Sequence, residues 1–210
     1  MKINYFDLGL FEDGLELEEV HRNILPKYNL EFNSYGFEAN PIYFNILQQK
    51  FNDSNLNIFN LAIFSENKPI KLYLSENKVG NSIYDTKKNV DKETYFTVSG
   101  KKFSTFLQEN NIELEGNINI CKINIEGAEW DFFNDIIDND LLKHFHLFCG
   151  AGNDVHKIKN FIENGISQKY DVLLKNNKII IYKFCMNFSL KRNLSFYKKI
   201  EELLKPFIIH

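Results

Sequence analysis

Two acidic residues stand at the ends of predicted strands, at a spacing that suits a nucleoside-binding site. Asp7 precedes Gly9 after the first apolar run, and Glu38 follows the second run about thirty residues later. In an open parallel sheet, ligands bind beyond the carboxyl ends of the strands. A glycine there lets the backbone approach a ligand, and an acid there can accept both hydrogens of a ribose diol. Each residue alone is better explained as a cap or a strand end. Together they favour a nucleoside-type ligand.

A second group of polar residues could take a proton from an acceptor. Glu126 ends the fourth core strand and faces the predicted site, and Glu129 lies in the first turn of the next helix, where the helix dipole favours a carboxylate whatever its function. His144 and His146 share one face of the following strand, and a neutral His accepts a proton near pH 7. We take Glu126, His146 and His144 as candidate catalytic bases. For Glu129, capping and substrate binding both stay open.

The segments that must position these residues alternate between strand-like and helix-like patterns. The sequence predicts strands at 4–8, 33–37, 55–64, 70–74, 94–99, 118–125 and 144–149, and helices at 12–22, 42–51, 128–137, 154–163 and 189–204. Right-handed crossovers turn such a series into a doubly wound α/β fold with a parallel sheet. Near the C-terminus, segments 171–174 and 178–184 predict an antiparallel hairpin.

Composition favours an ordinary globular domain and argues against several partners. The 210 residues are 44% apolar and 25% charged, which predicts one domain at 1–188 and a C-terminal helix at 189–210 that packs on it or on a partner subunit. The net charge of -3 disfavours nucleic acid, and no apolar run reaches the roughly 18 residues of a membrane span. We expect a cytoplasmic protein with no membrane partner that acts on a small molecule. The three cysteines suit buried reduced thiols.

Four segments together resemble the FkbM family of methyltransferases. They are Phe6-Asp7-Leu8-Gly9, Tyr35-Gly36-Phe37-Glu38-Ala39-Asn40-Pro41, Asn60-Leu61-Ala62, and Cys121-Lys122-Ile123-Asn124-Ile125-Glu126-Gly127-Ala128-Glu129. The last is the most specific, because the family signature reads approximately Lys-Ile-Asp-Val-Glu-Gly-Ala-Glu. The resemblance implies a class I methyltransferase fold, with strand order 3-2-1-4-5-7-6 and an antiparallel last strand. It also implies S-adenosyl-L-methionine as the cofactor and a hydroxyl of a sugar or secondary metabolite as the acceptor.

The resemblance also assigns roles to single residues. Asp7 and Gly9 would line the methionine end of the cofactor and Glu38 the ribose. Asn60, Ala62 and Asn124 complete the set of cofactor-binding residues that the resemblance implies. Ser82, in the polar loop between the fourth and fifth predicted strands, and Glu129 would contact the substrate.

Two departures from the family pattern affect the chemistry. Phe11 and Asp13 replace the Asn and second Gly of the first loop, with Gly14 one place late, so the loop must follow a different path. Asn124 replaces the usual Asp, and an amide cannot act as a base and weakens a hard-metal site by one charge. We therefore expect no metal.

Several alternatives to a sugar O-methyltransferase stay open at this stage. One is transfer to a nitrogen or a carboxylate of a small molecule, and another is a non-catalytic homologue that only binds the cofactor. Asp154 and His156 are the next candidates for a base. The sequence leaves the acceptor and the oligomeric state undetermined.

Overall fold

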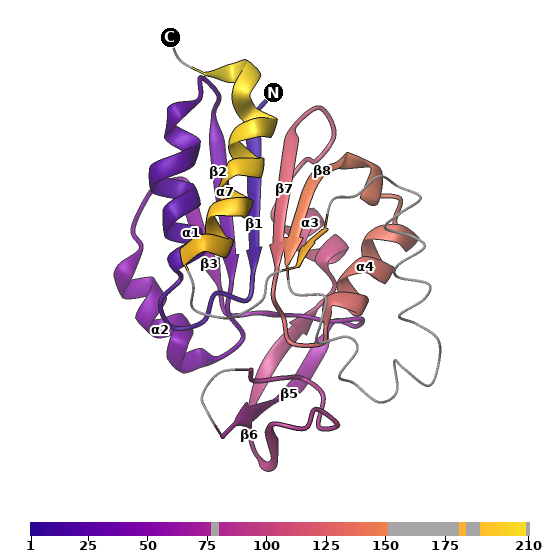
Figure 1. Cartoon of the computed structure of the whole chain (residues 1–210). Coiled ribbons are helices and arrows are strands. Elements are labelled where there is room, and N and C mark those ends of the chain that lie inside the picture. Colours follow the sequence, from indigo (N-terminus) through magenta and orange to yellow (C-terminus); the bar gives the residue numbers. More distant parts are fainter. Residues whose placement is uncertain (77–79, 151–180, 184–189, 209–210) are drawn as a thin grey trace.

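A parallel sheet with helices on both faces forms the body of the protein (Figure 1). The computed structural model describes residues 1–76, 80–150, 181–183 and 190–208. In spatial order the sheet contains β3 (Leu56–Phe59), β2 (Phe32–Phe37), β1 (Ile3–Leu8), β7 (Ile118–Ile123), β8 (Phe145–Gly150) and β9 (Ile181–Lys183). Each neighbouring pair in this sheet is parallel. The predicted doubly wound α/β sheet is therefore confirmed for these strands.

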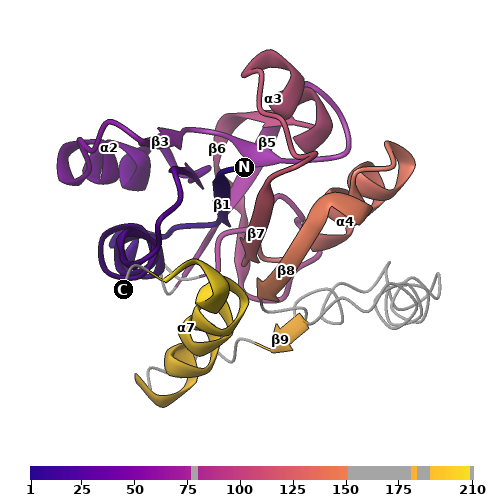
Figure 2. The same cartoon turned by 90° about the horizontal axis from the view of Figure 1, so that it is seen from above.

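Helices cover the two faces of the sheet, and each face has its own apolar core. One face carries α1 (Leu15–Glu18), which continues as a π-helical turn η1 (Glu19–Ile24) and a 3-10 turn η2 (Leu25–Lys27), together with α2 (Pro41–Lys50) and α7 (Leu190–Leu204). The other face carries α3 (Phe103–Glu109) and α4 (Glu129–Asp138) (Figure 2). Two further 3-10 turns, η3 (Leu142–His144) and η5 (Lys205–Phe207), complete the described helices.

Aromatic side chains make up much of the core on the face of α3 and α4. Phe6, Phe103 and Phe132 are fully buried, and Phe103 meets each of the other two rings edge to face at centroid distances of 5.2 and 5.0 Å. Such pairs add to the free energy gained from burying apolar area. On the opposite face, Phe196 and Ile200 of α7 are buried on the sheet of their own chain.

A second, smaller sheet projects beyond the carboxyl ends of the central strands (Figure 1). It has the order β4-β6-β5, with β4 (Ala62–Ile63) parallel to β6 (Val90–Lys101) and β5 (Lys68–Ser75) antiparallel to it. Its inner face has a small core that includes Ala62, Leu72 and Val98. The connection between β5 and β6 therefore reaches the edge of the sheet where a ligand is expected.

Three sequence predictions need correction here. The strand predicted at 55–64 is two strands in different sheets, because the Asn60 side chain donates to the carbonyls of Glu38 and Ala39 and the chain turns away. The helix predicted at 12–22 begins only at Leu15, because Asp13 and Gly14 belong to the preceding loop.

The third correction concerns the predicted antiparallel strand near the C-terminus. β9 pairs with β8 in parallel, with Phe148 opposite Ile181. The other half of the predicted hairpin, at 171–174, lies outside the described residues, as do the predicted helix at 154–163 and the residues Asp154 and His156.

Candidate functional site

The carboxyl ends of β1, β2 and β7 come together at one edge of the sheet and bring most of the predicted site residues with them. The backbone N–H of Gly9 donates to the Phe37 carbonyl at 3.0 Å, and that of Asn124 donates to the Leu8 carbonyl at 2.8 Å. Glu38 follows β2 directly, so it lies beside the loop that starts at Gly9. The structure therefore places Gly9, Glu38 and Asn124 at one site.

Glu38 is held by the backbone of two loops. One carboxylate oxygen accepts the N–H of Phe11 at 2.8 Å, and the other accepts the N–H of Asn40 at 2.7 Å. Burial raises the pKa of the Glu38 carboxyl to about 7, while these two N–H groups and the Lys122 ammonium act in the opposite direction. The Leu10 N–H also lowers this pKa, so three backbone N–H groups act on the carboxylate. A carboxylate has about four lone-pair sites, which leaves capacity to accept from a ligand.

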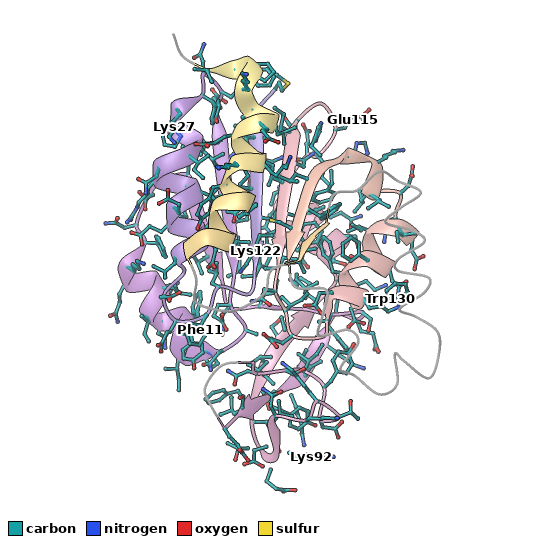
Figure 3. All side chains as sticks on the ribbon, in the orientation of Figure 1. Phe11, Lys27, Lys92, Glu115, Lys122 and Trp130 are labelled. Carbon is teal, nitrogen blue, oxygen red and sulfur yellow. The ribbon has the colours of Figure 1, made fainter. Side chains whose placement is uncertain are left out.

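The first loop follows an unusual path at Phe11. This residue has a φ of +61°, which is rare for a bulky side chain, and its ring meets that of Tyr43 edge to face at 5.1 Å. Gly14 is also left-handed, with a φ of +56°. The first loop thus contains three residues with positive φ, Gly9, Phe11 and Gly14, and Phe11 is labelled in Figure 3. Its departure from the family's loop path stays a prediction.

The structure explains the glycine at position 9 differently from the sequence prediction of close approach to a ligand. Its φ is +87°, and a Cβ there would lie 2.0 Å from the Asn124 carbonyl oxygen. The backbone that approaches Gly9 closely is that of the protein itself, where the neighbouring parallel strands β1 and β7 end side by side. Close packing of the fold therefore accounts for this glycine.

Asp7 also differs from the expectation, because its carboxylate points into the protein. Asp7 is fully buried, with one oxygen 2.8 Å from the Lys122 ammonium and the other accepting the Tyr5 hydroxyl at 3.0 Å. Burial raises the pKa of Asp7 to about 6, against the opposing effect of Lys122. Lys122 also donates to the Gly9 carbonyl at 2.7 Å. Lys122 had no predicted role, although it is the only charged residue in the apolar run 118–125.

Glu126 lies beyond the end of β7 and is paired with a buried lysine. Its φ is +56°, and its carboxylate forms an ion pair with Lys87, which is buried and also donates to the Gly80 carbonyl at 3.0 Å. The Ser82 hydroxyl donates to the Glu126 carbonyl at 2.8 Å. Loop 80–87 of the small sheet is thus attached to the end of β7. The polar composition of this loop gave no signal that Lys87 would be buried.

Removing the Lys87 ammonium should destabilise this junction. Breaking a buried ion pair typically costs about 3–5 kcal/mol, and we expect about 2 kcal/mol for Lys87→Met because the Glu126 side chain is 13% exposed. Lys88→Met, at the exposed neighbouring position, is the matched control and should change the free energy of unfolding by less than about 0.5 kcal/mol. Urea unfolding measures both. Equal stability of the two variants would contradict a structural role for the Lys87–Glu126 pair.

Glu129 and Ala62 make contacts within the fold, and their predicted contacts with substrate and cofactor stay predictions. The carboxylate of Glu129 is buried and accepts the N–H groups of Ile125 and Gly127 at 3.1 and 2.8 Å, so it fixes the turn between β7 and α4. Ala62 packs in the core of the small sheet. Asn60, as described above, links β3 to the loop after Glu38.

The structure does not bring His144 and His146 to this edge. β8 begins at Phe145, and Asn119, near the start of β7, pairs with it; the Asn119 N–H donates to Nδ1 of His146 at 3.2 Å. His146 therefore lies near the amino-terminal end of β8, four residues or roughly 13 Å before its last residue, Gly150. His144 lies in η3, before the strand begins. The prediction that both histidines share one face of a strand is therefore wrong, because His144 belongs to η3 and the strand starts at Phe145.

Other observations bear on ligand chemistry. Cys121 and Cys149 are free, buried thiols whose pKa values burial raises, in agreement with the expectation for these two cysteines. Cys185 lies outside the described residues. Within the described residues, no three His, Cys, Asp or Glu side chains converge as metal ligands, and no helix has the length and apolarity to cross a membrane. A groove of about 650 Å³ lies apart from the site, between α2 and β3, and Asn45, Gln48 and Asn57 are among its lining residues.

Comparison with known proteins assigns the chain to a family. The model of the methyltransferase FkbM domain matches residues 16–177, a range that includes Glu38 and Glu126 and begins after Asp7 and Gly9. Neither a curated protein nor a solved structure matches the chain. Because the matched range is more than half of the chain, this protein belongs to the FkbM methyltransferase family.

Proposed function

We propose that the protein transfers a methyl group from S-adenosyl-L-methionine to a hydroxyl of a sugar or sugar-like small molecule. The observation that carries the proposal is the placement of two carboxylates, Glu38 after β2 and Glu126 after β7, at the same edge of a parallel sheet. Ligands of such sheets bind at this edge. The proposal extends the methyltransferase activity of the family to a cofactor and an acceptor class.

The residues at this edge fit the cofactor. Glu38 is ionisable and is positioned by backbone N–H groups of two loops, and its remaining lone pairs could accept the hydrogens of a ribose diol. The loop from Gly9 to Gly14 runs beside it and would contact the rest of the cofactor. When bound, S-adenosyl-L-methionine supplies a methyl group activated by a sulfonium.

Glu126 is the group we propose to handle the proton. As the acceptor oxygen bonds to the methyl carbon, the bond from that carbon to sulfur breaks and the hydroxyl proton must leave. The Glu126 carboxylate would take that proton, and the Lys87 ammonium holds the carboxylate in place. The cytoplasmic location and the absence of a metal requirement remain part of the proposal.

Cofactor binding and turnover test the proposal separately. Calorimetry should show one site for S-adenosylmethionine and S-adenosylhomocysteine, and a coupled S-adenosylhomocysteine assay over a panel of sugars, amines and carboxylic acids should give turnover with a hydroxyl compound. Glu126→Gln should lower kcat by about 10²–10⁴. Turnover should survive excess EDTA.

The control is Glu115→Gln, at an exposed position near the far end of the sheet (Figure 3). It should keep full activity. Turnover with only amines or carboxylic acids would reject the hydroxyl assignment, and cofactor binding without turnover on any acceptor would favour a non-catalytic homologue. Full activity of Glu126→Gln would show that the base is another residue.

A further inference from the structure

Lys122 places a charge in the apolar interior of the protein. It is 2% exposed and lies on the face of the sheet that α7 covers, among buried residues that include Tyr5 and Cys149 (Figure 3). Its ammonium has two oxygen partners, the Asp7 carboxylate at 2.8 Å and the Gly9 carbonyl at 2.7 Å. Asp7 in turn accepts the Tyr5 hydroxyl. The result is a buried series of polar contacts that runs from Tyr5 through Asp7 and Lys122 to the carbonyl of the first residue after β1.

Stability of the fold alone does not account for this arrangement. A buried ion pair has a large desolvation cost, and replacing it with apolar side chains of similar size is often neutral or stabilising. The surrounding residues of this core are mostly apolar, so two further apolar side chains would suit positions 7 and 122. What an apolar pair could not do is bind the Gly9 carbonyl.

The Gly9 carbonyl is where the first loop leaves the sheet. The N–H groups of Gly9 and Leu10 both donate to the Phe37 carbonyl, and the next N–H, that of Phe11, donates to the carboxylate of Glu38. Lys122 therefore fixes one end of a short segment whose other end orients Glu38. We propose that Lys122 is a positioning residue of the cofactor site, which acts by holding the Gly9 carbonyl. This inference rests on the proposed function of that site.

A pair of substitutions separates positioning from charge neutralisation. Lys122→Met leaves the buried Asp7 charge without its cation, so it should lower both stability and cofactor affinity. Combining it with Asp7→Asn removes the second charge, while the new amide can still accept the Tyr5 hydroxyl. The double variant should therefore recover the urea midpoint of unfolding, yet it has nothing to hold the Gly9 carbonyl. Asp7→Asn alone keeps Lys122 beside Gly9 and is the matched single variant.

Two measurements on these proteins test the proposal. By calorimetry, the double variant should bind S-adenosylhomocysteine at least about tenfold more weakly than the parent, as expected for loss of one hydrogen bond to a charged group. The Asp7→Asn single variant should lose less affinity for S-adenosylhomocysteine than the double variant does. Without any ligand, hydrogen exchange at the Leu10 and Phe11 amides should be at least about tenfold faster in the double variant than in the parent.

These measurements distinguish failure of the inference about Lys122 from failure of the proposed function. If the parent does not bind S-adenosylhomocysteine, the proposed function is wrong, and hydrogen exchange still decides whether Lys122 holds the loop. If the double variant recovers stability, affinity and amide protection together, Lys122 only neutralises Asp7 and the inference is overturned. A double variant that stays as unstable as Lys122→Met would also overturn it, because the ion pair would then be needed for folding itself.

Discussion

Glu38→Gln should weaken S-adenosylhomocysteine binding by about 1.5–3 kcal/mol and remove most of its pH dependence. The carboxylate is the form that accepts ribose hydroxyls, and the loss of one charge-assisted hydrogen bond costs that much. With the pKa of Glu38 raised to about 7, the parent protein should bind about tenfold more weakly at pH 6 than at pH 8. Calorimetry at several pH values measures both effects.

The same group should make the ligand-free protein less stable as the pH rises. The folded state holds the Glu38 proton up to about pH 7, whereas the unfolded chain releases it near the ordinary value of 4.5. Because the folded state binds more protons in this window, the stabilisation is full below about pH 4.5 and is lost as the pH rises through about 7. Between pH 5 and pH 8 the Glu38 contribution should fall by about 2.5 kcal/mol.

The difference in the free energy of unfolding between the parent and Glu38→Gln separates the contribution of Glu38 from those of other acids. Burial also raises the pKa values of Asp7 and Asp131 to about 6, so these carboxyls contribute in the same direction in both proteins and cancel in the difference. Glu31→Gln, at an exposed position, should leave the pH dependence of unfolding as in the parent. A constant stability difference between parent and Glu38→Gln from pH 5 to pH 8 would show that Glu38 is ionised throughout.

Gly9→Ala should destabilise the fold by more than about 4 kcal/mol. The added Cβ would lie 2.0 Å from a backbone oxygen of Asn124, which cannot move without disturbing β7, and the residue would also have to keep a φ of +87°. Cofactor affinity should fall with it, because Gly9 begins the first loop. Urea or thermal unfolding measures the loss of stability.

A second glycine separates the two causes of this loss of stability, which are the close contact with Asn124 and the positive φ. Gly116 has a φ of +71° but nothing within 4 Å of an added Cβ, so Gly116→Ala should cost only about 1 kcal/mol. The excess for Gly9→Ala is then the effect of the close contact with Asn124. Similar losses at the two positions would mean that backbone conformation, and not the close contact with the Asn124 carbonyl, explains the requirement for glycine at position 9.

The local sequence was enough to predict the sheet and the edge at which a ligand would bind. Apolar runs and helical spacing are properties of neighbouring residues, and parallel strands necessarily end at one edge, so Glu38 and Glu126 could be placed together without a structure. The FkbM signature around Glu126 identified the family for the same reason, because it is a continuous segment. Element boundaries could not be predicted in this way. The predicted strand 55–64 is split in two because the Asn60 side chain donates a hydrogen bond to the Glu38 carbonyl.

The partners of the charged side chains were decided only by the tertiary structure. Lys122 meets Asp7 and Gly9 across a separation of more than one hundred residues, and Lys87 reaches Glu126 from the loop between β5 and β6. Local periodicity places a residue on a face or in a loop, but it does not say which distant oxygen a buried ammonium will find. For this reason Asp7 and Gly9, which the sequence assigned to a ligand, are held by the protein itself, while the lysines that organise the site had no predicted role.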